Sequence, residues 1–169
     1  MEVEDAIHAR RTHKQYGGEA LDPSTLASLL ELARWAPNHH LTQPTRFRVL
    51  GPGTRARLEA ACGGKEASKL RRAPTLVLAS AILTGDPRTD EEDLLSTGCA
   101  VYAILLGATA RGLASYWRTP AALDEPHARA VLGLAANERI VGLVHLGPRV
   151  SDPPVKERPE LATLVETMP

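Results

Sequence analysis

Residues 94–110 read LLSTGCAVYAILLGATA, a run of 17 residues without a charge. A helix that spans a bilayer needs roughly 20 strongly apolar residues, whereas this run is rich in Gly, Ala, Ser and Thr. We therefore predict a buried helix over residues 91–111, closed by Gly112, and no membrane span. Because this helix is apolar on nearly all sides, a small domain would struggle to cover it, which favours a partner subunit.

Shorter elements alternate on both sides of this run. Asp22-Pro23 is a typical helix start, with Asp as the N-cap and Pro in the first turn, and Pro37 ends that helix. Asp124 is predicted to cap a later helix. The other predicted helices cover residues 3–11, 54–62 and 159–167, and the predicted strands cover residues 46–50, 74–79, 114–118 and 139–146. This order indicates one domain, residues 1–169, of the α/β or α+β class with a small mixed or antiparallel sheet.

Composition excludes several functional classes. The 169 residues include 20 basic and 20 acidic side chains, so there is no bulk attraction to nucleic acid or to an anionic membrane. The first residues, MEVEDAIHARR, are charged where a secretory signal would need an apolar core. Cys62 and Cys99 lie far apart without a CxxC pair, which favours a reduced, cytoplasmic setting.

Most catalytic signatures are absent from the sequence. It contains no GxGxxG after a strand, no phosphate loop, no HExxH, no GxSxG and no zinc spacing. The acidic stretch 86–93 lacks the central glycine of a calcium loop, so a solvated helix start is the better interpretation. We expect no metal.

Two basic clusters remain as candidate sites. If the chain is extended after the first helix, Arg10, Thr12 and Lys14 point to one side and could hold an anion or a phosphate. The alternative is a solvated basic helix end. Lys156 and Arg158 in the tail could clamp the same phosphate, provided that this tail or a partner's tail folds back.

A third basic region spans residues 40–75, with eight basic and two acidic residues. A nucleic-acid surface would interleave such charges with aromatic side chains. Phe47 is the only aromatic residue there, so a solvated face that attracts at most an anionic cosubstrate is favoured.

Four motifs occur in order along the chain. They are RRTHKQY (10–16), ARWAPNHHLTQP (33–44), GCA followed by GLASYWR (98–118), and IVGLVHLG followed by KERP (140–159). They are similar to the R-R-S-x-R/K-x-F opening, the A-R-x-A-P…Q-P-W segment, the central helix ending in A-x-G-L-G-x-x-W, and the final strand with its K-x-R tail of one family. The chain thus resembles the flavin-dependent nitroreductases, most closely their short members.

The resemblance implies an α+β three-layer sandwich that forms a homodimer and binds FMN at the subunit interface. It implies an NAD(P)H oxidoreductase that reduces nitroaromatics, quinones or related small acceptors by ping-pong hydride transfer, because one flavin serves donor and acceptor in turn. Three alternatives stay open: a flavin-binding sensor or store with little turnover, a branch with a specialised substrate, and a basic binding module without flavin.

The resemblance also implies roles for individual residues. Phosphate contacts come from the first cluster and the tail, Lys14 reaches the pyrimidine edge of the flavin, and the stretch from Pro37 to Gln43 comes from the other subunit. His39 could donate to substrate or flavin, or could be a polar interface residue. The implied cofactor-binding residues are Arg10, Arg11, Thr12, Lys14, Trp35, Pro37, His39, Gln43, Trp117, Arg118, Thr119, Lys156 and Arg158. The implied nicotinamide contacts are Gly107, Ala108, Thr109, Ala110, Arg111 and Gly112.

Two residues depart from the family pattern. Leu41 stands where relatives often carry Asn, and Thr45 stands where a tryptophan usually follows Gln-Pro. The identity of the acceptor is therefore left open more than that of the cofactor.

Overall fold

The computed structural model describes residues 1–168 and contains one four-stranded sheet. The strand order is β1-β2-β4-β3, and every neighbouring pair is antiparallel. The last strand in the chain is inserted between β2 and β3, so the two strands that flank α5 are not neighbours. The strands are β1 (Thr45–Val49), β2 (Thr75–Ile82), β3 (Leu113–Arg118) and β4 (Glu138–Pro148).

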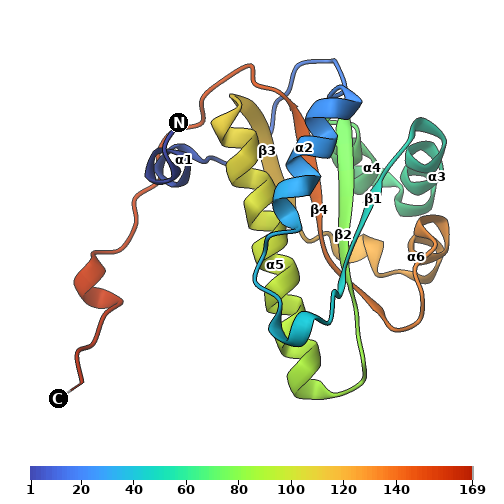
Figure 1. Ribbon diagram of the computed structural model, residues 1–169. Coiled ribbons are helices and arrows are strands. Elements are labelled where there is room, and N and C mark those ends of the chain that lie inside the picture. Colours follow the sequence, from blue (N-terminus) through green and yellow to red (C-terminus); the bar gives the residue numbers. More distant parts are fainter. Residues whose placement is uncertain (169) are drawn as a thin grey trace.

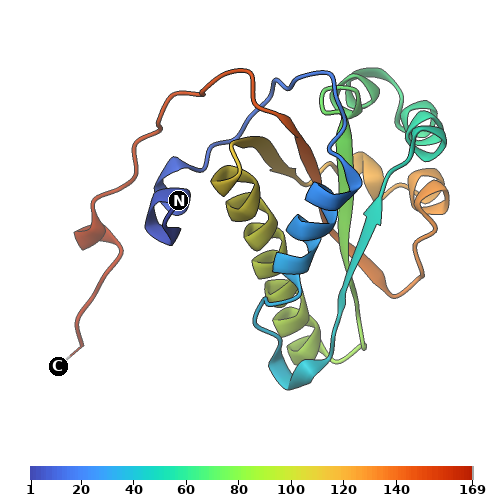
Figure 2. The ribbon, with the colours of Figure 1, turned by 45° about the horizontal axis from the view of Figure 1, so that its top comes forward.

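Helices cover both faces of this sheet, which gives the expected three layers (Figures 1 and 2). One face packs against α2 (Pro23–Ala33) and α5 (Pro87–Ala110), and the other against α3 (Pro52–Cys62), α4 (Gly64–Leu70) and α6 (Pro126–Leu132). The short α1 (Val3–Ala9) contacts α5. Because both faces of the sheet are covered, the interior strand β2 is buried along nearly its whole length and is apolar except for Thr75 and Ser80.

Helix α5 starts four residues earlier than predicted. The Asp86 side chain accepts a hydrogen bond from the Thr89 amide at 2.8 Å, and Pro87 occupies the first turn. By length and composition this helix could cross a membrane, but half of its most apolar stretch is buried inside the fold. The chain covers most of α5 by itself and leaves a stripe that includes Leu95 and Tyr102 exposed. The expectation that a domain of this size would struggle to cover the helix was too broad.

Two predictions near the C-terminus were wrong. Asp124 does not cap α6; it ends a 3-10 turn, Ala121–Leu123, and Glu125 precedes the helix without a side-chain cap. The predicted helix over 159–167 is a single 3-10 turn, Leu161–Thr163. Residues 159–168 project away from the body (Figure 1), so no tertiary contact within the described chain supports a short helix there.

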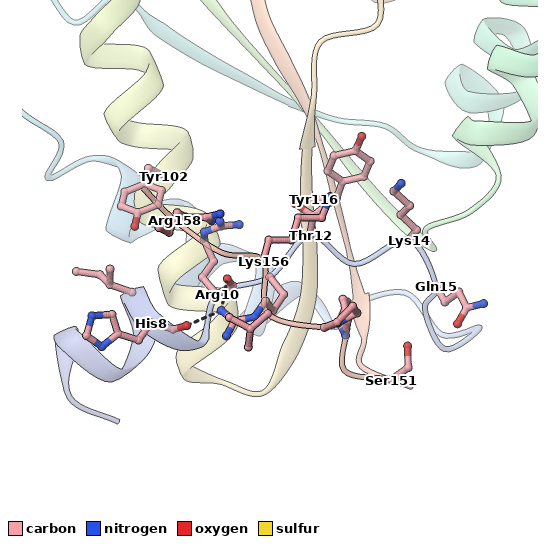
Figure 3. A pocket seen from close by; sticks show the side chains of 15 residues that line it. His8, Arg10, Thr12, Lys14, Gln15, Tyr102, Tyr116, Ser151, Lys156 and Arg158 are labelled. Carbon is pink, nitrogen blue, oxygen red and sulfur yellow. Dashed lines mark hydrogen bonds between the residues drawn. The ribbon is translucent and has the colours of Figure 1, made fainter. Parts of the chain in front are cut away.

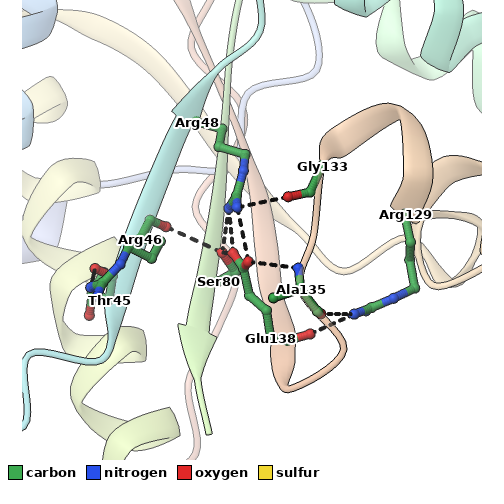
Figure 4. Close-up of polar contacts among 8 residues, drawn as sticks. All are labelled: Thr45, Arg46, Arg48, Ser80, Arg129, Gly133, Ala135 and Glu138. Carbon is green, nitrogen blue, oxygen red and sulfur yellow. Dashed lines mark hydrogen bonds and ion pairs between the residues drawn. The ribbon is translucent and has the colours of Figure 1, made fainter.

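An ion pair ties three strands together on the face that carries α6 (Figure 4). Arg48 of β1 donates to both oxygens of Glu138, with Nη2 2.9 Å from Oε2, and Ser80 of β2 also donates to this carboxylate. Burial alone would raise the pKa of Glu138, but the hydrogen bonds from Arg48 and Ser80 outweigh it and hold the pKa below its ordinary value.

Much of the basic region 40–75 is paired in the same way. Besides Arg48, both Arg55 and Arg71 contact Glu59, and Lys69 contacts Glu66. These pairs cancel a large part of the local charge excess, which agrees with a structural surface.

Candidate functional site

A cavity of about 1190 Å³ lies beside the edge strand β3 (Figure 3). Its walls come from α1, from the segment 10–15 that follows it, from one residue each of α5 and β3, and from the tail 151–158. Segments from both ends of the chain therefore meet over one hollow.

The first basic cluster, Arg10, Thr12 and Lys14, lines this cavity because α1 ends at Ala9, directly before it. Arg10 has φ −57° and ψ 126°, so the backbone leaves the helical region directly after α1. The chain then runs beside β3, with the His13 amide donating to Ser115 O at 3.0 Å. His13 is buried, whereas Arg10, Thr12 and Lys14 lie on the cavity wall as the spacing predicts; Arg11 and Gln15 also reach this wall, so the alternation is incomplete.

The charge of this cavity differs from that of the whole chain. Five cationic side chains line it, and of the described residues no Asp or Glu does. None of the five has a carboxylate within ion-pair distance in the described part of the chain; Arg11 instead donates to backbone oxygens of His8 and Arg10. Like charges that converge without counter-charges favour an anionic ligand. The five are Arg10, Arg11, Lys14, Lys156 and Arg158.

The tail reaches the cavity within the same chain. After β4, Arg149 forms a local ion pair with Asp152, and residues of the segment 151–158 then line the cavity. Lys156 and Arg158 thus share the cavity with Arg10 (Figure 3). The sequence left open whether this tail or a partner's would do so.

Two tyrosines of the cavity wall, Tyr102 of α5 and Tyr116 of β3, were missed by sequence reasoning. Tyr116 packs against the ring of His145 with centroids 5.9 Å apart. Burial, with smaller repulsions from nearby arginines, lowers the pKa of His145 to about 3, so a neutral imidazole backs the tyrosine. Alternation along β3 was the available signal, because adjacent residues of a strand face opposite sides.

Alternation places Trp117 on the opposite face of β3 from Tyr116, and none of the residues predicted at the end of β3 lines this cavity. The Trp117 indole donates to Val141 O at 3.1 Å and faces a second, apolar groove of about 550 Å³ beside Leu95. Arg118 forms an ion pair with Glu66, with Nη2 2.8 Å from Oε2. Thr119 is exposed.

The predicted residues of the second motif lie elsewhere in the chain. Pro37 is held by Ser96, and His39 lies 3.6 Å from Glu92, both in the N-terminal half of α5. Ser96 precedes Tyr102 by six residues, roughly 9 Å along the helix axis. A single chain therefore does not bring Trp35, Pro37, His39 and Gln43 to the cavity.

The predicted nicotinamide contacts are only partly accessible. A Cβ on Gly107 would lie 2.4 Å from Leu32 Cδ1, so this glycine serves the close approach of α2 and α5. Ala108 and Thr109 are also buried, which leaves only the segment 110–112 at the surface. The buried three residues cannot contact a ligand in this fold.

Comparison with known proteins agrees with this architecture. The sequence matches the Nitroreductase family over residues 7–69 and 60–148. It is 29% identical over 163 residues to YdjA of Escherichia coli, provisionally named an NAD(P)H nitroreductase, with 87% of this chain and 88% of YdjA covered. It is 26% identical over 172 residues to the similarly named YfhC of Bacillus subtilis, with 92% and 89% covered.

Solved structures show the same fold. A nitroreductase-like protein from Bacillus cereus superposes with a TM-score of 0.90 at 24% identity, over 99% of this chain and 96% of that one. A provisionally assigned nitroreductase from Desulfovibrio desulfuricans, solved in complex with FMN, gives a TM-score of 0.81 at 26% identity, again over 99% and 96%.

Proposed function

The chain belongs to the nitroreductase family, and from this premise we propose that it is a single-domain, FMN-dependent oxidoreductase. It takes reducing equivalents from NAD(P)H and passes them to a nitroaromatic, a quinone or a related small acceptor. Named relatives are provisional NAD(P)H nitroreductases, and a structural neighbour holds FMN. The observation that carries the proposal is the convergence of five cations on one cavity to which no described residue contributes a carboxylate.

The cavity suits a phosphate-bearing cofactor. Arg10, Lys156 and Arg158 would hold the phosphate of FMN together with the Thr12 hydroxyl, because a guanidinium can grip two phosphate oxygens at once. Tyr102 and Tyr116 supply aromatic wall for a planar ring.

The chain's own residues bind and orient the cofactor and the substrates. Bound FMN would supply the hydride chemistry itself, which explains why no catalytic triad is visible. Lys14 projects from the same wall and would stabilise negative charge on the reduced ring through its ammonium group. His39 and Gln43 would act from a second copy of the chain.

We infer a homodimer from two features. The stripe on α5 around Leu95 and Tyr102 is exposed and forms part of the apolar groove. The residues 35–43 are separated from the cavity within one chain. We also place the protein in a reducing compartment, because both cysteines are free among the described residues.

The test is spectroscopic. We expect the purified protein to be yellow with an FMN absorbance band, to be bleached by NADH or NADPH in the absence of oxygen, and to recover on addition of an acceptor. Bleaching without recovery on any acceptor would favour a sensor or store, and failure to bind FMN would favour a binding module without flavin. Initial-rate plots should run parallel, as a shared site for donor and acceptor requires.

A further inference from the structure

The segment from Pro37 to Gln43 has an unusual backbone. Of the non-glycine residues that the structure describes, only His40, Leu41 and Gln43 have a left-handed φ, at 51°, 53° and 52°. This region is unfavourable for L residues, most of all for one such as Leu41 that has no polar side chain to bond its own backbone. These three strained residues of the described chain thus all lie within residues 40–43.

Helix α5 holds both ends of this segment. Asp93, Ser96 and Thr97 are buried and lie on one helix face, since residues three and four apart are neighbours there. Ser96 Oγ donates to Pro37 O at 2.6 Å, and Thr97 Oγ1 lies 2.9 Å from Thr45 Oγ1. Two of the three side chains therefore fix the entry to and exit from the strained turn.

Asp93 holds the middle of the segment. Thr42 Oγ1 donates to Asp93 Oδ1 at 2.5 Å and accepts from Asn38 Nδ2 at 3.0 Å. Asn38 Oδ1 in turn accepts from the Gln43 amide at 2.8 Å. Three hydrogen bonds in series connect the buried carboxylate to the strained backbone.

The side chains that this clamp presents point outward. His39, His40, Leu41 and Gln43 are all exposed, so the strain is not offset by their burial in the core. Strained backbone that the surrounding structure over-determines is found at ligand-facing sites, where geometry must be set in advance.

We propose that Asp93 is a positioning residue of the flavin site: through Thr42 and Asn38 it holds the turn that presents His39 and Gln43. This rests on the proposed function, in which these two residues reach the flavin of the partner subunit.

The test compares Thr42→Val with Thr42→Ser in the FMN-loaded protein. Valine keeps the shape of threonine but removes the hydroxyl that both Asp93 and Asn38 contact, whereas serine keeps the hydroxyl. We expect Thr42→Val to lower kcat about tenfold at saturating FMN and acceptor, because small displacements of positioning groups are costly. Amide hydrogen exchange of residues 38–43 should quicken at least about fivefold, the equivalent of one of the two hydrogen bonds that the hydroxyl makes. Thr42→Ser should restore both values.

If the Thr42 variants do not fold, a second pair of variants tests the backbone strain at Leu41. Leu41→Gly frees the backbone at a left-handed position, and Leu41→Ala removes the same exposed side chain but keeps the restriction. Because glycine adopts this φ without strain, we expect amide exchange of residues 38–43 to be slower in Leu41→Gly than in Leu41→Ala.

The outcomes separate the two proposals. Wild-type protein that binds no FMN would overturn the proposed function, and the positioning role with it. Wild-type protein that binds FMN and turns over, with kcat unchanged in Thr42→Val and equal exchange in Leu41→Gly and Leu41→Ala, would overturn only the positioning role and leave the clamp a structural feature.

Discussion

Arg48 and Arg10 lie in the same neutral chain, but their surroundings are opposite. Arg48 contacts a buried carboxylate, a serine hydroxyl and the carbonyl oxygen of Gly133 (Figure 4). Arg10 lies among four other cations on the wall of a cavity that is lined by no carboxylate of residues 1–168 (Figure 3). A charge with all its partners inside the chain stabilises the fold, whereas converging charges without partners destabilise it slightly and indicate a ligand.

The largest expected effect tests the structural half of this comparison. Arg48→Met leaves the Glu138 carboxylate buried without its cation, which should lower the free energy of unfolding by about 3–5 kcal/mol. Denaturant unfolding measures the loss. Arg10→Met is the matched control and should leave the free energy of unfolding unchanged or slightly raised.

A double variant sharpens that result. Arg48→Met combined with Glu138→Gln removes both charges and should recover part of the loss, because no unpaired buried ion remains. If the double variant were less stable than Arg48→Met alone, the ion pair would not be the source of the stabilisation.

The next largest effect tests whether the cations of the cavity bind a ligand. Arg158→Ala should weaken FMN binding to the apoprotein roughly tenfold to a hundredfold, since a hydrogen bond to a charged group is worth about 1.5–3 kcal/mol. Riboflavin, which lacks the phosphate, should bind nearly as it does to the wild type. Arg57→Ala, which removes an exposed arginine outside the cavity, is the control. Equal losses for both flavins would mean that Arg158 supports the fold and does not hold the phosphate.

Local sequence signals predicted one half of this comparison better than the other. The alternation of Arg10, Thr12 and Lys14 depends only on neighbouring residues, and so does the Asp22 cap, whose carboxylate accepts from the Thr25 amide at 2.9 Å. The Arg48–Glu138 pair joins residues 90 positions apart and has no local signature.

Other features escaped prediction for similar reasons. Leu41 has a left-handed φ, but because the residue is not glycine, the sequence did not predict this conformation. Tyr116 was passed over because the motif drew attention to the adjacent Trp117, although two successive strand residues cannot face one site. The tail has helical spacing, but the structure gives that spacing nothing to pack against.

A smaller effect appears on acidification. The pKa of Glu138 is lower in the folded chain than the usual value of about 4.3 in an unfolded one. Its contribution is therefore complete above that value and is lost as the pH falls through the folded-state pKa. The stability advantage of wild type over Glu138→Gln should stay level from pH 7 to about 5 and shrink below it.

His145 sets the background for this measurement. Its pKa of about 3 in the folded chain lies below the usual value of about 6.5, so the unfolded chain binds a proton first and stability falls as the pH drops below 6.5. Both proteins keep His145, so the difference between them isolates the carboxylate. An advantage that shrank already between pH 7 and 6 would contradict the assignment to Glu138.

The smallest effect uses salt to distinguish the two environments. Lys14, Lys156 and Arg158 are exposed on the cavity wall, so added salt screens their attraction for a phosphate, whereas the Glu138 side chain is only 2% exposed and its pair is screened much less. Raising sodium chloride from low concentration to about 0.5 M should weaken FMN binding by up to roughly fivefold, since a unit charge pair at ~4 Å in water is worth about 1 kcal/mol. The stability difference between wild type and Arg48→Met should stay constant over the same range.

Isothermal titration with FMN and denaturant unfolding at each salt concentration measure the two quantities. FMN affinity could instead prove insensitive to salt while the stability difference between wild type and Arg48→Met declines. The roles assigned to the cavity cations and to Arg48 would then have to be exchanged.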